Sequence, residues 1–230
     1  PTGGGNLITT TGATFTGNIA TAGISAVTAG TSNFVAGVNA GNSITSGGNY
    51  NTVVGDEAGT ALTLGDESVA VGFEALMTAT TGAENVGIGY RALKLTTGNS
   101  NVAVGKNALA TNSSASNNTA VGTSALSANT TGTENVAVGS SSMLVNTTGS
   151  YNTAVGKNAL DANTTASYNT GVGRSSLSNN TTGASNTAVG YYSLLANTTG
   201  TRNDALGISA LSSNTTGSHN TSIGGQTLAA

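Results

Sequence analysis

Side chains able to support catalysis are few in this sequence, and their spacing matches no catalytic pattern. His219 is the only histidine, and there is no cysteine. A Ser-His-Asp triad needs a histidine between a nucleophile and a carboxylate, and nothing in the spacing around His219 supports one. Lys106 and Lys157 follow glycine in two AVGKNAL segments, which lack the G-x-x-x-x-G-K-[ST] frame of a phosphate-binding loop. The sequence therefore predicts that the protein is not an enzyme.

Acidic residues gather in one part of the chain, where a cation or a carboxylate pair could act. They are Asp56, Glu57, Asp66, Glu67, Glu74 and Glu84. If they lie on stacked strands, neighbours such as Glu57 and Glu74 are about 4.8 Å apart, and their like charges repel unless a cation bridges them. Ca²⁺ prefers carboxylate oxygens, but no calcium-binding loop is recognisable here. A solvated acidic face is the favoured interpretation, and neither a metal nor a cofactor is expected.

The tripeptide Asn-Thr-Thr recurs at a regular interval. Its copies start at Asn129, Asn146, Asn163, Asn180, Asn197 and Asn214. Each copy is formally a glycosylation sequon. The regular recurrence favours a structural role instead, in which stacked asparagine amides hydrogen-bond from one repeat to the next.

Aromatic and cationic side chains are the candidates for ligand binding. Tyr151 and Tyr168 occupy equivalent places in adjacent repeats and are expected to stack on each other. Outward aromatic rings can also bind sugars, although a stacked cross-strand pair is a common structural arrangement. The candidate binding residues are Tyr191, Tyr192, Arg174, Arg202 and His219.

These residues are embedded in a repeat of seventeen amino acids. Repeats of the form N-x-x-V-G start at residues 51, 68, 85, 101, 118, 135, 152, 169, 186, 203 and 220, with one sixteen-residue step after 85. A weaker copy with one extra residue runs from Asn33 to Tyr50. Each repeat is numbered here from its first residue, and a column means one repeat position followed through successive repeats. A fixed short period of this kind is typical of a solenoid.

The columns indicate which positions face inward. Position 5 is Gly in all eleven copies, position 4 is Val, Ile or Leu in all eleven, and position 9 is Leu or Met in ten. Fourteen of the fifteen charged residues fall at positions 6, 7, 10, 16 and 17. Two apolar segments separated by charged turns predict a coil of two short strands, and the Asn-Thr-Thr-Gly turns disfavour helix.

The fold class is therefore all-β, a β-solenoid or β-roll with one coil for each seventeen-residue repeat. Residues 1–32 lack the repeat and are expected to form a β-rich lead-in segment. Residues 33–230 are expected to form the solenoid, regular from residue 51. Two columns are predicted to form the buried core, represented by Val121, Val138 and Val155 at position 4 and by Leu126, Met143 and Leu160 at position 9.

Composition limits the partners of the chain. Only 7% of its 230 residues are charged and its net charge is −3. The six Lys and Arg residues form no basic patch, so nucleic acid is not an expected partner. No apolar run approaches the roughly 20 residues of a membrane span, so membrane insertion is not expected either. The chain begins with Pro1 and stops within a repeat, which suggests an excerpt of a longer or processed protein.

The tandem pattern NTAVGxxALxxNTTGxx resembles the repeats of bacteriophage tail-fibre proteins that carry a C-terminal self-cleaving chaperone of the endosialidase type. It is more loosely similar to the heads of trimeric autotransporter adhesins, which use a shorter repeat with a VAIG core. SVAVGFEAL and NVGIGYRAL carry that second likeness. The resemblance covers about residues 33–230. The segment NLITTTGATFTGNIATAG is similar to Gly/Thr-rich linking segments of phage fibres and favours the phage assignment.

The resemblance implies a parallel homotrimeric fibre, located in a virion tail or otherwise outside the cell. Its expected role is a structural shaft that contributes to binding of a host receptor, either a glycan or a surface protein. One Val and one Leu per repeat also leave a lone coil with a thin core, which favours partner chains. The trimer count itself comes from the resemblance.

The alternatives are a bacterial adhesin head, an ice-binding solenoid and a glycan-cleaving enzyme. Ice binding is disfavoured because neighbouring residues of a strand point to opposite faces, so Thr-Thr exposes only one threonine column. Glycan cleavage needs a carboxylate pair in a groove, whereas the acidic residues fall in predicted turns.

Overall fold

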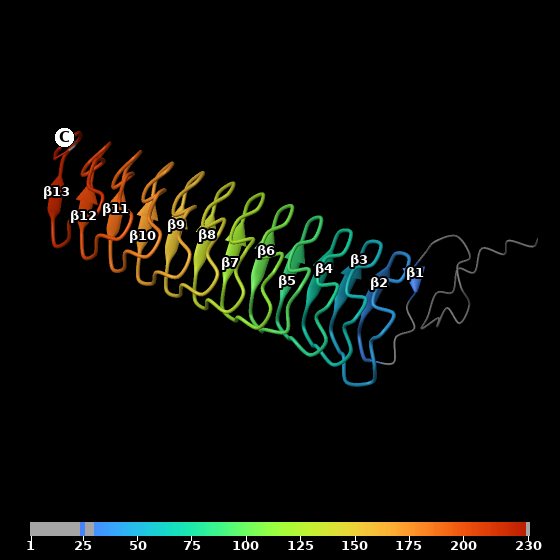
Figure 1. Ribbon diagram of the computed structural model, residues 1–230. Helices are drawn as coiled ribbons and strands as arrows, with labels where there is room; N and C mark the ends of the chain where they lie inside the picture. Colours follow the sequence, from blue (N-terminus) through green and yellow to red (C-terminus); the bar gives the residue numbers. More distant parts are fainter. Residues whose placement is uncertain (1–23, 26–29, 229–230) are drawn as a thin grey trace, which may run out of the picture.

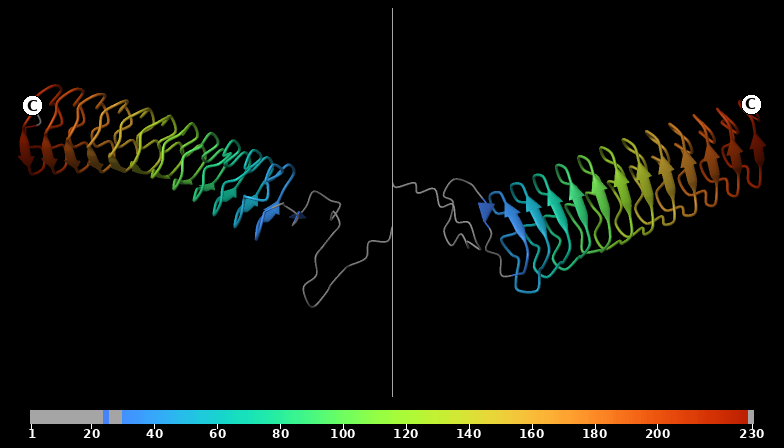
Figure 2. Two further views of the ribbon diagram at one scale, coloured as in Figure 1. Left: turned by 90° about the horizontal axis from the view of Figure 1, so that it is seen from below. Right: turned by 180° about the vertical axis from the view of Figure 1, so that it is seen from behind.

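The computed structural model describes residues 24–25 and 30–228. Its strands form one thirteen-stranded sheet in which they follow each other in sequence order. The coils stand side by side in a single row with β2 and β13 near opposite ends (Figure 1), and the stack is gently curved (Figure 2). The chain is therefore a rod, and the predicted all-β solenoid is confirmed.

One strand per coil builds the sheet. The strands are β1 (Ile24–Ser25), β2 (Phe34–Ala36), β3 (Thr52–Val54), β4 (Val69–Val71), β5 (Val86–Ile88), β6 (Val102–Val104), β7 (Thr119–Val121), β8 (Val136–Val138), β9 (Thr153–Val155), β10 (Thr170–Val172), β11 (Thr187–Val189), β12 (Asp204–Leu206) and β13 (Thr221–Ile223). β1 pairs with β2 antiparallel, whereas every later pair is parallel. Residues 1–23 and 26–29, most of the predicted lead-in, lie outside the described residues.

The register of the strands follows the sequence repeat. Thr119 pairs with Val136, seventeen residues later. The two irregular steps are also present, because Phe34 pairs with Thr52 and Val86 with Val102. The period read from the sequence is therefore the period of the coil.

The second strand predicted for each coil does not form, and that prediction is wrong. The residues at position 9 have positive φ angles, 51° at Leu126 and 48° at Met143, which lie outside the β region. This half of the coil is a series of turns that still bonds from coil to coil. The Leu126 N–H donates to the Ser142 carbonyl at 2.9 Å, and the Met143 N–H donates to the Ala159 carbonyl at 2.9 Å.

The leucine column fills the interior of the rod. Leu126, Met143 and Leu160 are fully buried, which confirms that half of the predicted core. They pack in one cluster with small residues, among which are the position-3 alanines of the strands. The interior is therefore narrow, since alanine on the strand faces leucine on the turns.

The valine column is not buried within the chain, so the other half of the predicted core is wrong. Val121 and Val155 are each 37% exposed, and Val138 is half-buried. Side chains alternate along a strand, and position 3 takes the inward place in each three-residue strand. Position 4 therefore points outward in every coil.

The Asn-Thr-Thr asparagines form the predicted ladder inside the rod. The Asn163 Nδ2 donates to Oδ1 of Asn146 at 2.8 Å and to the carbonyl of Ala166 at 3.0 Å. The Asn146 Nδ2 donates in the same way to Oδ1 of Asn129 at 3.0 Å. All three residues are fully buried. Their amides hold the turns together, and the folded coil leaves no room for a glycan on them.

A second asparagine ladder, at position 1, was not predicted. The main-chain N–H of Asn152 and its Nδ2 both donate to Oδ1 of Asn135, at 3.0 and 3.2 Å. The Asn152 Nδ2 also donates to the carbonyl of Ala166 at 2.9 Å. Asn152 and Asn163 both donate to this carbonyl, so the two ladders share acceptors. They link the residue before each strand to the turn that precedes the following strand.

Candidate binding surface

Three outward surfaces run along the rod, and all three are set by the strands. The strand face consists of positions 2 and 4, which point away from the interior. The post-strand corner consists of positions 6 and 7, directly after each strand. The pre-strand corner consists of positions 16 and 17, directly before the next strand. A side chain that recurs in one column lies next to its equivalents about 4.8 Å away.

The strand face is apolar along its length. Position 4 is Val, Ile or Leu in every coil from β3 to β13, and position 2 is Thr or Val except at Asp204. Exposure of these side chains is substantial, with Ile88 at 39% and Val136 at 37%. The strands of this face pair in register, so position 4 presents a continuous apolar column.

The predicted binding residues fall into two groups that do not meet. Arg174, Tyr191 and Tyr192 lie in the post-strand corner, two or three residues beyond the ends of β10 and β11. Arg202 and His219 lie in the pre-strand corner, two residues before β12 and β13. The strand face separates the two groups, so the five residues cannot line one site.

The post-strand group packs on itself. The rings of Tyr191 and Tyr192 have their centroids 3.9 Å apart, and the Arg174 guanidinium lies 5.7 Å from the Tyr191 centroid. The hydrogen bond with Tyr192 and partial burial raise the pKa of the Tyr191 hydroxyl above its ordinary value. Two side chains therefore approach the Tyr191 ring, which leaves less of it open to stacking by a sugar.

The pre-strand group is more open. Arg202 Nη1 lies 3.3 Å from His219 Nε2, and both residues are exposed. Earlier in the same column, Tyr151 and Tyr168 stack at 5.1 Å with an interplanar angle of 1°, as predicted. The Glu134 carboxylate raises the pKa of the Tyr151 hydroxyl. The column therefore carries aromatic side chains followed by cationic or titratable ones.

A cluster around Tyr90 was missed by the sequence analysis. Tyr90 stacks on Phe73 at 5.6 Å, and Arg91 and Lys106 lie 4.8 and 5.9 Å from its ring centroid. Reading position 6 as a column would have found it, because Phe73, Tyr90 and Lys106 all occupy that position. The ring faces of Tyr90 are taken by these neighbours.

Salt bridges neutralise part of the same cluster. Glu74 Oε2 binds Arg91 Nε at 2.6 Å and Lys94 Nζ at 2.7 Å. The hydrogen bonds from Lys94 and Arg91 hold the pKa of Glu74 below its ordinary value. The charged groups of Glu74, Arg91 and Lys94 are thus paired with each other, which suits a structural cross-link between coils.

Glu57, Asp66, Glu74 and Glu84 each accept hydrogen bonds from donors of the protein. Glu57 accepts a hydrogen bond from Asn39 Nδ2 at 2.7 Å, while Glu74 is engaged by its two cations. In the part of the chain that the structure describes, no three histidine or acidic side chains come together as a metal site.

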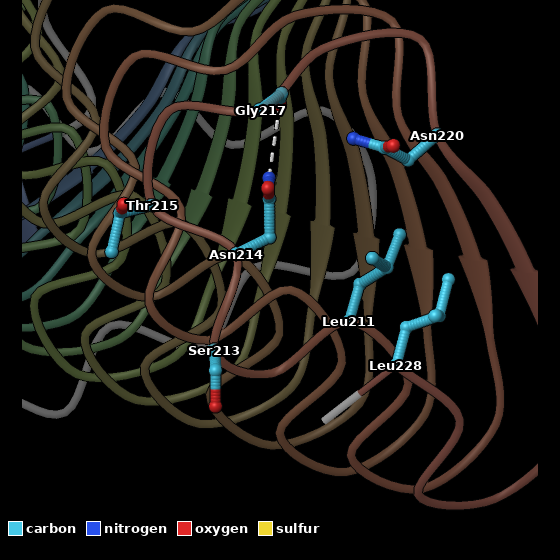
Figure 3. Close-up of a pocket in the computed structure, with 7 residues that line it drawn as sticks. All are labelled: Leu211, Ser213, Asn214, Thr215, Gly217, Asn220 and Leu228. Atoms are coloured by element: carbon cyan, nitrogen blue, oxygen red, sulfur yellow. Dashed lines mark hydrogen bonds between the residues drawn. The ribbon is translucent and has the colours of Figure 1, made fainter. Parts of the chain in front are cut away.

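A polar depression lies at the end of the rod that bears β13 (Figure 3). It is lined by Leu211, Ser213, Asn214, Thr215, Gly217, Asn220 and Leu228. Asn214 Nδ2 donates to the Gly217 carbonyl at 3.0 Å. The depression is the uncovered interior of the last described coil, where the two asparagine ladders end. No ionisable side chain lines it, so it offers no acid–base chemistry.

No protein-family model, curated protein or solved structure gives a significant match to this chain. Among residues 24–25 and 30–228 there is no helix long and apolar enough to cross a membrane.

Proposed function

We propose that the chain is a structural fibre segment that associates in parallel with two copies of itself through the strand face. The observation that carries this proposal is the continuous column of outward Val, Ile and Leu side chains at position 4. A soluble chain rarely leaves a long apolar strip in water unless the strip meets a partner. Asp204 is the only charged residue on this face from β3 to β13.

The strand face is long and narrow, so its length rather than its area supports such an interface. Strands β2 to β13 at a spacing of ~4.8 Å give a strip of about 50 Å, and three residues give a width of ~10 Å. Each copy thus offers on the order of 500 Å², divided between its two neighbours, so each of the three pairwise contacts buries about 500 Å² in total, less than a standard two-partner interface. Parallel association sets identical columns against each other with the same spacing.

The biological role follows from the resemblance to phage tail fibres. We place the chain in the shaft of a virion tail fibre, outside the cell, where the stacked coils act as a stiff spacer. The two corners flank the strand face and stay in water when that face is buried, so they are the surfaces available to a host receptor.

A second candidate, ice binding, is favoured by the recurrence of threonine on the same face. Thr119, Thr153 and Thr170 recur at position 2 of β7, β9 and β10. Valine interrupts this column at four other coils, and no threonine occupies position 4. The position-13 hydroxyls are also engaged, as when Thr147 Oγ1 donates to the Thr164 carbonyl at 3.1 Å. These interruptions make self-association the better proposal.

The test is the mass of the folded chain in solution, measured by light scattering after size exclusion. A trimer of the 22.1 kDa chain has a mass of about 66 kDa, three times that value. The double variant Val121→Glu with Val155→Glu places charges on the strand face and is expected to give a folded monomer.

The matched control is Thr131→Glu with Thr165→Glu, which adds the same charges at exposed position 14 and is expected to stay a trimer. Unchanged circular dichroism shows that each variant keeps its coils. A wild-type chain that is stable and monomeric at 22.1 kDa would overturn the proposal.

A further inference from the structure

We propose that the pre-strand corner between Tyr168 and Arg202 is a binding notch for a saccharide ring that carries a carboxylate. This inference rests on the proposed function only for its biological use, which is recognition of an acidic glycan by the fibre. Its physical basis lies in the column geometry, one uncovered aromatic face, and main-chain donors left without partners.

The notch is made by a short residue between two long ones. Position 17 reads Tyr168, Ser185 and Arg202 in three successive coils. The coils are in register here, since the Ser185 N–H donates to the Ser167 carbonyl at 3.2 Å and the Arg202 N–H to the Ala184 carbonyl at 3.1 Å. Two coil spacings separate Tyr168 from Arg202 by about 10 Å. Ser185 is exposed and leaves this space open.

Tyr168 offers an open aromatic face to this space. Tyr151 stacks on one side of its ring, and no other ring or cation among the described residues contacts it. The residue is 60% exposed, compared with 39% for Tyr191 and 39% for Tyr90, whose rings are approached by arginine or lysine. Tyr168 is therefore better placed than either to stack on the apolar face of a sugar.

Two main-chain N–H groups beside the notch lack an acceptor. Where the next coil carries a serine at position 16, the position-16 N–H donates to its hydroxyl, as from Ser150 to Ser167 Oγ at 3.0 Å and from Thr201 to Ser218 Oγ at 2.9 Å. Ala184 has no side-chain oxygen, and Thr201 Oγ1 is turned toward Ser218 Oγ. Within the described residues, the N–H groups of Ser167 and Ala184 therefore find no partner in the protein.

The chemistry of these groups selects an acidic saccharide. The Tyr168 face accepts the C–H face of a pyranose. The Arg202 guanidinium contacts His219 through Nη1, and its other N–H groups can bind a carboxylate through charge-assisted hydrogen bonds. The two N–H donors and the Ser185 hydroxyl suit ring oxygens and hydroxyls. The notch itself carries no acidic side chain: Glu134 adjoins Tyr151, beyond the covered side of Tyr168, and Asp204 lies on the strand face.

The test is calorimetric titration of the chain with a glucuronic acid oligosaccharide and, in parallel, with a glucose oligosaccharide of equal length. The acidic ligand is expected to bind about tenfold more tightly. Arg202→Gln is expected to abolish this preference. Tyr168→Ala is expected to lower the affinity for both ligands by about tenfold. Lys157→Gln, which removes an exposed cation from the post-strand corner, is the matched control and is expected to change neither affinity.

A variant that fills the notch tests the inference without relying on a substitution that could unfold the chain. Ser185 has a φ of 61°, close to the 63° of Tyr168 and the 59° of Tyr151, so tyrosine fits the backbone at this position. Ser185→Tyr is expected to extend the stack, leave the melting temperature unchanged or higher, and reduce glucuronate binding at least about tenfold. Glucuronate binding that survives Ser185→Tyr, or equal binding of the neutral oligosaccharide, would overturn the inference.

The two proposals fail separately. A trimer that binds no glucuronate contradicts the notch and leaves the fibre proposal standing. A monomer that binds glucuronate in the manner described contradicts the fibre proposal and supports the notch.

Discussion

At the scale of single residues, the rod tolerates backbone conformations that most proteins avoid. Ser141, Met143 and Tyr151 all have φ between 48° and 59° within one repeat. A left-handed conformation costs a non-glycine residue roughly 1–2 kcal/mol. Position 9 retains leucine or methionine in spite of this cost because the side chain is needed in the interior, where it is fully buried.

Asp161 has a buried carboxylate oxygen, Oδ1, without a hydrogen-bond partner among the described residues, and this feature predicts how the stability of the chain depends on pH. Desolvation raises the pKa of this carboxyl above its ordinary value of 3.8, although a hydrogen bond with Ser178 opposes the change. A raised folded-state pKa means that the carboxyl favours folding most when protonated, and that this contribution is lost as pH rises through the folded pKa.

We therefore expect Asp161→Asn to stabilise the chain at pH 7 by on the order of 1 kcal/mol. The gain should shrink below pH 3.8, the ordinary value of the group, where the native carboxyl is also neutral. Thermal unfolding at both pH values measures this, with exposed Asp204→Asn as the control. A lower melting temperature for Asp161→Asn at pH 7 would show that the ionised carboxylate contributes more through Ser178 than its desolvation removes.

At the scale of the structural element, each coil consists of a three-residue strand and a set of turns. The turns must begin directly after the strand, at position 5. The glycine at position 5 makes this possible. Gly139 has a φ of +133° directly after β8, and a Cβ built on it would lie 2.6 Å from both the carbonyl carbon and the oxygen of Gly156. Its column is therefore closed to any side chain by the backbone of the next coil.

Gly139→Ala is accordingly expected to destabilise the chain by on the order of 3 kcal/mol, from backbone strain and main-chain contact. Ser141→Gly, two residues away at a φ of 57°, is the matched control and is expected to be neutral or to stabilise by up to about 1 kcal/mol. Denaturant unfolding of both variants measures the difference. Equal stability of Gly139→Ala and wild type would mean that neighbouring coils can move apart.

At the scale of the whole molecule, the rod is nearly one-dimensional, because each strand pairs only with its neighbours in sequence. Stability in such arrays is approximately a sum of coil terms and of interfaces between adjacent coils. The stability of the rod then depends less on the order of the coils than on the alignment of equivalent repeat positions. Every ladder and apolar column requires these positions to lie side by side in adjacent coils.

Deletion of residues 152–168 removes one complete coil and joins Tyr151 to Asn169 in phase. We expect this variant to fold with the same circular dichroism, with a melting temperature lower by only a few degrees. Deletion of residues 152–160 leaves half a coil and places leucine and asparagine columns out of phase, so we expect it to unfold at a much lower temperature. Comparable melting temperatures for the two deletions would contradict the column model of stability.

The period, the β-solenoid, the leucine column, the Asn-Thr-Thr ladder and the Tyr151–Tyr168 stack could all be predicted from the amino-acid sequence. Each of these depends on which residue types share a column, and a parallel in-register coil turns equal sequence position into spatial contact. Even the irregular steps at Phe34–Thr52 and Val86–Val102 could be counted before the structure was known.

The direction in which each strand turns its side chains, and the neighbours of each corner, became known from the folded chain. Position 3 and position 4 are both apolar, so the sequence does not say whether Ala120 or Val121 points inward. The choice depends on the width left beside Leu126, and the narrow interior accepts alanine. The uncovered face of Tyr168 is likewise a tertiary property, because the side chain next to it in the following coil is the short Ser185. The unpaired N–H groups of Ser167 and Ala184 also depend on the fold, because the neighbouring coil supplies no acceptor among the described residues.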